Sequence, residues 1–456
     1  MNWQGNCTKR GMTHYTNLLF ADKELLHQRF LTTDLGELYQ AIPFEELALQ
    51  IPVSKHEQSG KGCKPWFNVK GALGLMFLKH YLGISDALLI ERINTDWSMQ
   101  LFCEISLAPT EKINDTNLPS YWRGYLGRYM NVDSLQMILA KHWKPFMRET
   151  RIGMQDATCY ESRIAHPSDI KLLWKSCDNV HTILQKMRRV KCMRKSRVKF
   201  GKHKKEFMEY QLRKKKTKKQ EKKIRKKLLL FLLKLMNLLD DISAVLSLRN
   251  AGRMQTIIKV YAQQHQRAFG DPTEPIKDRI VSLSKPYIRP IVRGKEVKPV
   301  EFGAKVNKLV VDGIGFIEHL SYDAFNECKR FKNGIYLQRK LFGKCTHQSG
   351  DKIYATNENR VYCKGQNIQT NFIPKGKQKT IFIEQSTILR RELNKERGTV
   401  LEGSFGNDKN HYLLQKINAR NIHTEKCWIF FGIHTANASK IATRIIEKTQ
   451  TNSRAA

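Results

Sequence analysis

A run of 42 residues, from Lys186 to Lys227, carries half of the formal charge of this chain. It holds 22 lysines and arginines and three glutamates, a net charge of +19 out of +38 for all 456 residues. Side chains that repel one another at this density stay in water or against a polyanion. The run passes directly into LLLFLLKLMNLLDDISAVLSL, an apolar, helix-forming stretch. It is therefore predicted to be either a solvated helical arm or an arm that lies along nucleic-acid phosphates.

Length and composition narrow the class of protein. The chain is long enough for two or three domains, and its 41% hydrophobic content is that of a globular protein. Its charge favours nucleic acid as partner over an acidic membrane surface. The longest apolar run, 228–239, falls short of the ~20 residues that a spanning helix needs. Because the ten cysteines form no C-x-x-C pair and no signal peptide is expected, we expect a cytoplasmic protein without zinc or membrane.

Residues 1–148 are predicted to be helical. Leu35, Leu38 and Ile42 recur with a helical period, and further helices are expected over 65–80, 85–94 and 97–105. The turn YLGISD between two of these helices fits a helix-turn-helix that binds DNA. It fits a small helical bundle equally well, so both interpretations stay open.

The pattern changes at residue 150. Ile152, Met154 and Asp156 alternate in RIGMQDATCYES, which predicts a strand, and Ser168 is the expected N-cap of a following helix. Other strand-rich segments are expected near 295–320, 333–354 and 366–384. Helices are expected over 385–395, 402–418 and 428–448.

Three acidic residues suggest phosphoryl transfer assisted by metal ions. Glu402 stands seven residues before Lys409, so on a helix both side chains leave the same face. Asp156 in GMQDATCYES and Asp351 in SGDKIYATNENR lie in strand-like contexts. Carboxylates of this kind can hold two Mg²⁺ ions for phosphoryl transfer, beside a lysine that holds a phosphate as a point charge.

Local sequence leaves alternatives to each of these acids. Asp156 could occupy a surface turn, Asp351 an ordinary loop, and Glu402 a helix start where it favours the helix dipole. Asp312 in VVDGIG and Asp323 in SYDAF compete as the second acid. Spacing alone does not separate these candidates.

Longer stretches carry a resemblance. VKPVEFGAKVNKLVVDGIGFIEHLSYDAFNE, then GDKIYATNENRVYCKGQNI, then VLEGSFGNDKNHYLLQKINARNIHTEKCWIFFGIHTANASKI resemble bacterial insertion-sequence transposases of the DDE type, above all the group typified by insertion sequence five. The resemblance covers about residues 35–180 and 276–445. It implies that Asp156, Asp351 and Glu402 are the three catalytic, metal-holding acids, with Lys409 completing the E-x6-K pattern.

Two positions depart from the family pattern. Some relatives carry an arginine four residues before the glutamate, where this chain has Gly398, and Arg397 stands one place earlier. His166 in HPSD replaces a common aromatic residue.

The resemblance implies an α/β fold with an RNase H-like core, in which helices flank a mixed five-stranded sheet. The expected domains are a helical N-terminal DNA-binding domain (1–148), a core in two parts (149–180 and 276–448) around a basic helical insertion (181–275), and a loose tail (449–456).

The function that the resemblance implies is DNA transposition in a bacterial, nucleoid-associated setting. The enzyme would bind terminal inverted repeats, cleave the ends and join 3′-hydroxyls to target DNA, with Mg²⁺ or in its place Mn²⁺, as a homodimer or higher oligomer on double-stranded DNA. The residues expected to contact DNA are Lys409, Lys214, Lys215, Lys218, Lys222 and Arg225. A metal-dependent nuclease of the same fold, a non-catalytic transposase-derived DNA-binding protein and an RNA-associated basic protein remain alternatives.

Overall fold

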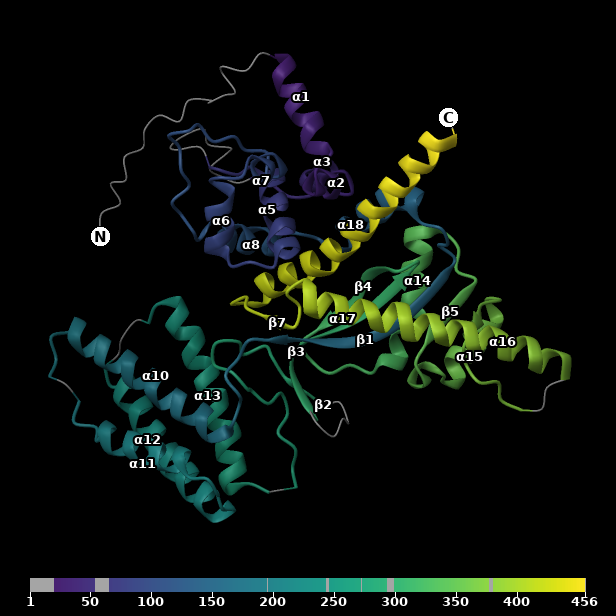
Figure 1. The fold of residues 1–456 in the computed structure, drawn as a ribbon. Coiled ribbons are helices and arrows are strands. Elements are labelled where there is room, and N and C mark those ends of the chain that lie inside the picture. The colour runs from purple at the N-terminus through teal and green to yellow at the C-terminus, as the bar shows by residue number, and fades with distance from the viewer. Residues whose placement is uncertain are drawn as a thin grey trace. The chain divides into compact units, whose positions relative to one another are not determined.

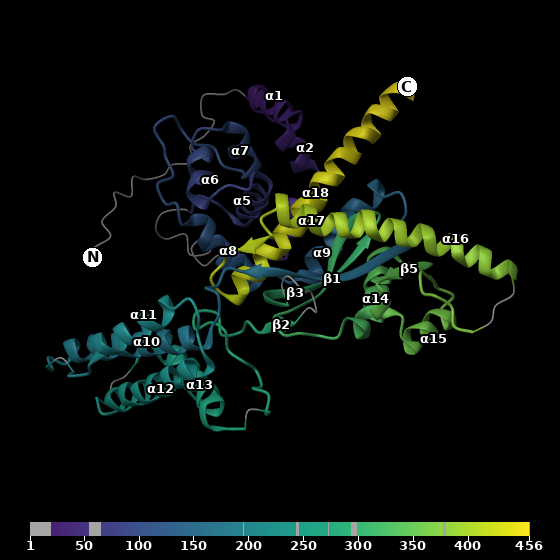
Figure 2. The ribbon, with the colours of Figure 1, turned by 60° about the horizontal axis from the view of Figure 1, so that its bottom comes forward.

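The chain folds into two compact units, called here the sheet unit and the helical unit. The sheet unit comprises residues 1–162, 305–321 and 325–456, and the helical unit comprises residues 163–304 and 322–324. This computed structural model describes residues 20–53, 65–194, 196–242, 246–271, 273–292, 299–376 and 380–455. Figures 1 and 2 show the ribbon of both units from two directions.

A mixed β-sheet forms the core of the sheet unit. Neighbouring strands follow the order β4–β3–β1–β5–β6. β3 and β4 are antiparallel, whereas β5 is parallel to both β1 and β6, and the short β7 is parallel to the end of β1. The chain is therefore an α/β protein. The strand bounds are β1 (Ile152–Ser162), β3 (Val300–Val311), β4 (Ile314–Ser321), β5 (His347–Gly350), β6 (Gln369–Thr370) and β7 (Lys416–Ile417).

Helices precede β1, as predicted. Their core includes a cluster of aromatic rings, Tyr39, Phe44, Phe77 and Phe102, whose centroids lie 4.8–5.9 Å apart in contacting pairs. The described helices are α1 (Phe20–Leu31), α2 (Asp34–Gln40), α3 (Phe44–Leu49), α5 (Val69–Leu82), α6 (Asp86–Ile93), α7 (Trp97–Phe102), α8 (Leu118–Tyr129) and α9 (Val132–Trp143). α5 and α6 meet at 113° across Gly83, which takes the left-handed conformation, so their geometry lies within the helix-turn-helix range.

The same pair of helices bears on membrane crossing. Within the described ranges, no single helix is long and apolar enough to span a membrane. α5 and α6 meet the criteria of length and composition only as a bent pair, and most residues of α5 are buried against the rest of the sheet unit.

The C-terminal half of the sheet unit is again rich in helices. α14 (Phe331–Phe342) and α15 (Asn357–Gly365) flank β5 in the sequence. α16 (Thr380–Glu396) continues into α17 (Glu402–His411) through one π-helical turn, η4 (Arg397–Leu401), and Figure 1 shows the three as one run. The long helix α18 (Ile422–Ala455) packs against α2, α5, α8 and β4.

The helical unit is built around four helices, which are seen together in Figure 2. They are α10 (Asp169–Val190), α11 (Phe200–Leu212), α12 (Lys218–Asp240) and α13 (Leu248–Phe269). Leu173, Cys177, Leu228, Leu232 and Ile257 belong to their buried core. The strand β2 (Pro290–Val292) pairs with residues 300–302 of β3. The highly basic run thus forms the end of α10, α11 and the start of α12, where it is helical as predicted. The prediction that it is an arm is wrong, because Phe207, Tyr210 and Ile224 of this run pack into the core of the helical unit.

Several local predictions are confirmed and others are wrong. The strand predicted near 150–165 is β1, and the helices predicted over 385–395 and 428–448 lie within α16 and α18. Among the described residues of 366–384, where strands were expected, only the two of β6 are a strand, and α16 begins at Thr380. In the strand-rich segment expected near 333–354, α14 extends to Phe342 and the strand is β5. The helix expected to reach residue 418 ends at His411, shortly before Leu413 takes a positive φ of 60°.

The predicted loose tail also differs in the structure. α18 continues through Ala455, and so includes residues 449–455 of that segment. No glycine or proline follows Gly432 in the sequence, so no residue of either type interrupts the helix.

A buried ion pair fixes α17 to the sheet. Lys308 on β3 lies 2.5 Å from Asp408 on α17, and both side chains are about 2% exposed. Tyr160 on β1 donates a hydrogen bond to the same carboxylate, and Ser404 accepts one from the Lys308 ammonium. A side chain at Gly315 of the neighbouring strand would overlap the Lys308 stem, since a Cβ there would lie 2.1 Å from Cε. The network holds β1, β3 and α17 together.

We predict that breaking this pair on one side will destabilise the protein strongly. Lys308→Met or Asp408→Asn alone should lower the free energy of unfolding by roughly 3–5 kcal/mol, because the remaining charge is left buried without a partner. The double variant should cost clearly less than the sum of the two. Urea unfolding of the four proteins measures this coupling, and additive losses would contradict it.

Candidate active site

Asp156 lies within the central strand β1. Its side chain is 21% exposed, although its neighbours Gln155 and Ala157 are buried. Burial, together with the nearby carboxylates of Glu327 and Asp351, raises the pKa of the Asp156 carboxyl to about 6. The N–H of Ala157, which donates to this carboxylate at 2.8 Å, and the charge of Arg397 oppose that shift. The group therefore exchanges its proton close to neutral pH.

Asp351 and Glu402 lie on two other elements. Asp351 follows the last residue of β5, the parallel neighbour of β1, and accepts a hydrogen bond from the N–H of Lys352. It is close enough to Asp156 to affect the pKa of that group. Glu402 is the first residue of α17 and is 57% exposed. The three acids thus have the predicted local structures. Asp156 lies in a strand, Asp351 at the end of a strand and Glu402 on a helix.

Arg397 connects two of the three acids. Its Nη1 lies 3.8 Å from a carboxylate oxygen of Asp156 and 3.4 Å from one of Glu402. Arg397 begins the π-helical turn η4, in which the N–H of Glu402 bonds to the Arg397 carbonyl five residues earlier. In a π-helical turn, residues five apart lie nearly above one another, which brings Arg397 to the same side as Glu402.

Two further groups at the site were missed from the sequence. Glu327, in the short helix η2 (Glu327–Arg330), raises the pKa of Asp156 and pairs with Lys305 at 2.7 Å. Tyr354 is fully buried, and burial together with the surrounding carboxylates, Asp156 first, raises its pKa well above the usual value. Local sequence held no signal for Glu327, because it reaches Asp156 through the fold. Tyr354 lies in the quoted stretch SGDKIYATNENR, but no role was assigned to it from the sequence.

Lys409 lies on α17, two turns after Glu402. Its ammonium group is 3.0 Å from the Thr158 hydroxyl on β1, two residues beyond Asp156 along that strand. It also lies 5.9 Å from the centre of the Tyr160 ring. These contacts place the amine over the strand that carries Asp156.

Buried glutamines support β1 just before Asp156. Gln155 donates to the Arg330 carbonyl at 2.9 Å and accepts from Gln348 at 3.3 Å. Gln338 donates to the Thr150 carbonyl at 2.9 Å. A Cβ at Gly334 would lie 2.0 Å from the Gln155 side-chain oxygen, so only glycine leaves room for this contact. Polar side chains bonded in this way fix the position of the strand.

The chemistry of these acids suits a hard divalent cation, since carboxylate oxygens are the ligands that Mg²⁺ prefers. Within the part of the chain that the structure describes, no three His, Cys, Asp or Glu side chains are gathered closely enough to hold a metal ion. Arg397 is the cation between Asp156 and Glu402 in this arrangement.

The two competing aspartates lie in other surroundings. Asp312, in the turn between β3 and β4, has a positive φ of 50°, pairs with Arg444 at 2.7 Å and accepts the N–H of Arg148. Those contacts give it a structural role. Asp323 belongs to the helical unit, where it is 72% exposed and lies 3.8 Å from Arg289.

The residues predicted to contact DNA from the basic run divide into two kinds. Lys214, Lys215, Lys218 and Lys222 are exposed in the helical unit. Arg225 differs from the prediction because it is buried, pairs with Glu221 and lies 3.8 Å from Asp169. Its guanidinium is used inside the helical unit, so we no longer assign it to the DNA-binding set.

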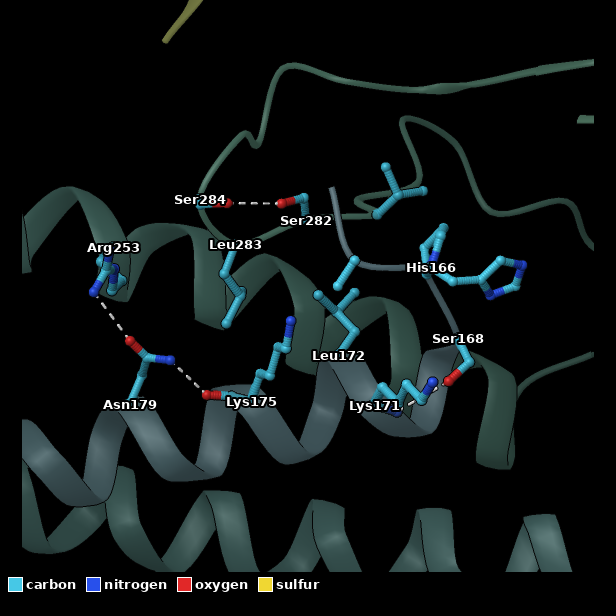
Figure 3. A pocket seen from close by; sticks show the side chains of 13 residues that line it. His166, Ser168, Lys171, Leu172, Lys175, Asn179, Arg253, Ser282, Leu283 and Ser284 are labelled. Carbon is cyan, nitrogen blue, oxygen red and sulfur yellow. Dashed lines mark hydrogen bonds between the residues drawn. The ribbon is translucent and has the colours of Figure 1, made fainter. Parts of the chain in front are cut away.

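A second basic feature of the helical unit lies at the HPSD motif. A cavity of about 170 Å³ is lined by His166, Ser168, Lys171 and Lys175 from the start of α10 and by Arg253 from α13. Figure 3 shows Arg253 donating to Asn179, 3.1 Å away, on the neighbouring helix. The described lining residues include no acid. The cavity therefore has the size and charge for one small anionic group.

No protein-family model matches this chain, and neither a curated protein nor a solved structure matches it.

The raised pKa of Asp156 predicts a dependence of stability on pH. Its folded pKa of about 6 exceeds the ordinary 3.8, so protonation of this group stabilises the fold below about pH 4. That stabilisation is lost as pH rises through 6. Above pH 6, Asp156→Asn should be more stable than the native protein by roughly 1–3 kcal/mol, and the difference should shrink toward pH 4.

Urea unfolding between pH 4 and 8 measures this difference. Glu392→Gln, a change at an exposed carboxylate on α16, is the control and should follow the native curve. A constant offset between Asp156→Asn and the native protein over that range would contradict the assignment.

Proposed function

We propose that this chain is a DNA transposase of the DDE type, which binds the terminal inverted repeats of its element, cleaves the ends and joins the 3′-hydroxyls to target DNA. The observation that carries the proposal is the position of Arg397 between Asp156 and Glu402, at 3.8 and 3.4 Å. Two acids far apart in the sequence thereby lie close to one cation. Asp351, which follows the neighbouring strand β5, raises the pKa of Asp156.

The sheet supports an RNase H-like core for this enzyme. The resemblance implies a mixed sheet of five strands with acids at strand ends and on a late helix. The strands in the order β4–β3–β1–β5–β6 are mixed in direction, and Asp351 and Glu402 stand at a strand end and at the start of a late helix.

The π-helical turn supports the equivalence of Arg397 to the family arginine. In an α-helix an arginine four residues before the glutamate shares its face, whereas a residue five before it is rotated away. The turn η4 adds the extra residue locally, so that Arg397 at five residues before Glu402 faces it. The departure at Gly398 is thereby compensated.

Each residue of the site has a role in the proposed reaction. The three acids are not gathered at one point in the described arrangement, so Asp156, Asp351 and Glu402 would have to draw together around Mg²⁺, or Mn²⁺ in its place. When bound, the ion would activate the attacking oxygen and stabilise the leaving one. Asp156 must first lose its proton, which its pKa of about 6 allows at neutral pH. Arg397 reduces the repulsion between Asp156 and Glu402. Lys409, held over β1 by Thr158, would contact a DNA phosphate.

The helical unit would supply binding to the DNA backbone. Its exposed lysines and the cavity at the HPSD motif offer positive charge to phosphates, and contacts to phosphates are largely independent of DNA sequence. Because two element ends must be held together, we expect at least a dimer on DNA.

The test of this function is strand transfer by the purified protein on the DNA ends of its own element with Mg²⁺. Joined products should form with the native protein and fall on the order of 10³-fold or more in Asp156→Asn, Asp351→Asn and Glu402→Gln. Glu392→Gln on α16 is the matched control, since it makes the same chemical change at an exposed glutamate.

Other outcomes would identify the alternatives. Cleavage without joining would favour a nuclease of the same fold. Binding without either reaction would favour a non-catalytic descendant. Activity that survives in Asp351→Asn and is lost in Asp323→Asn would contradict the assignment of the second acid.

The cavity at the HPSD motif predicts a specific change in salt dependence. If Lys171, Lys175 and Arg253 hold one phosphate together, changing all three to Gln should reduce the slope of log affinity against log salt by about 0.9. Lys214→Gln/Lys215→Gln/Lys218→Gln removes the same charge from separate exposed positions. Because each of these lysines can contact a phosphate of its own, the slope should fall by up to three times as much. Titrations of duplex DNA at several salt concentrations measure both slopes, and equal changes would argue against a shared phosphate.

A further inference from the structure

A groove in the sheet unit, separate from the residues of the acid site, runs along α8. Its volume is about 1160 Å³, and it is lined by α8, by the loop before α18 and by parts of α5 and α6. The lining combines tyrosines with basic side chains, namely Tyr121, Tyr125, Tyr129, Lys79, Arg123, Arg128 and Arg420. The strand transfer proposed above needs none of these side chains, although Ser85 and Asp86 of the groove belong to the turn YLGISD between α5 and α6.

The three tyrosines form a ladder on one face of α8. They are spaced by four residues, which places them in a row along the helix. The rings of Tyr121 and Tyr125 are stacked with centroids 6.5 Å apart, and those of Tyr125 and Tyr129 are 4.8 Å apart. Tyr121 and Tyr129 are 51% and 44% exposed, so the two ends of the ladder present aromatic surface to the groove.

Helix α8 is firmly packed against its neighbours. A Cβ at Gly127 would lie 2.4 Å from the His423 carbonyl oxygen, so α8 approaches α18 more closely than any side chain would allow. Arg123 lies 4.6 Å from the centre of the Trp428 ring and donates two hydrogen bonds to Asp86. A ladder on a helix held in this way can bind a partner without losing much conformational freedom.

The charge of the groove is positive. Asp86 is the only acid among its described lining residues, and both Lys79, at 2.9 Å, and Arg123 neutralise it. Arg128 and Arg420 are exposed. The groove therefore suits an anionic partner that also offers flat apolar surfaces.

We infer that this groove binds an unpaired strand of DNA. Bases stack on the exposed faces of Tyr121 and Tyr129, and the backbone phosphates lie near Arg128 and Arg420. In a duplex the base faces are covered by neighbouring bases, so only unpaired bases reach the tyrosines. A second copy of the chain could also cover aromatic surface, but a chain with a net charge of +38 is a poor partner for a positively charged groove.

This inference goes beyond the proposed function, because it concerns a different site and needs neither a metal ion nor cleavage. The test compares affinities for a labelled oligothymidylate of about 16 nucleotides and for a duplex of the same length. Fluorescence anisotropy without divalent ions is measured at the highest salt that still allows binding by the native protein, where the contribution of phosphate contacts is smallest.

Tyr121→Leu/Tyr129→Leu should weaken binding of the single strand about tenfold or more and change duplex affinity less than about twofold. Tyr121→Phe/Tyr129→Phe should bind as the native protein does, since the aromatic faces remain. Tyr336→Leu on α14 is the matched control because this tyrosine is 54% exposed, and it should change neither affinity.

Three results would overturn the inference. The first is an equal loss for single strand and duplex. The second is no loss for either while the protein remains in one oligomeric state. The third is no loss for either together with a dimer that dissociates in sedimentation, which would identify a second copy of the chain as the occupant of the groove. Photo-cross-linking of the native protein to 5-bromodeoxyuridine oligonucleotides gives a test that does not depend on folding of the variants. Cross-links in residues 118–129 support the inference, and cross-links found only elsewhere overturn it.

Discussion

The buried ion pair between Lys308 and Asp408 is the contact on which the geometry of the sheet unit depends. Burying two charges costs free energy, and the contact repays that cost only because Tyr160 and Ser404 complete the hydrogen bonds. In exchange, the pair sets the position of α17 on the sheet. Glu402 begins that helix and Lys409 directly follows Asp408, so the relation of both residues to Asp156 follows from this pair.

The sequence predicts local structure at the acids better than it predicts their contacts. Asp156 in a strand and Glu402 on a helix follow from alternation and spacing, together with the resemblance. The contact between Arg397 and both acids depends on a π-helical turn, which has no recognised sequence signal in RGTVL. Glu327 and Arg225 show the same limit, because the burial and partners of each depend on segments distant in the sequence. Neither the alternation of apolar residues in a strand nor their period in a helix indicates which distant side chains will pair.

Basic side chains serve two different purposes in this chain. Lys308, Arg123 and Arg225 are buried and paired, and each joins elements within its own unit. Lys214, Lys215 and Lys218 are exposed. The count of 80 lysines and arginines therefore overstates the number of cations offered to a partner. A change at a buried cation should act on stability, whereas a change at an exposed one should act on binding.

Helix α18 has a consequence for how the chain acquires its structure during synthesis. Phe431 and Trp428 on this helix contact Phe77 and His80 on α5, and α18 also packs against α2 and α8. The N-terminal helices are made some 300 residues earlier, so while the ribosome is still translating they expose the apolar surface that α18 later covers. The N-terminal helices therefore depend on α18, which is made after them. A chaperone would be needed at these N-terminal helices until α18 is in place.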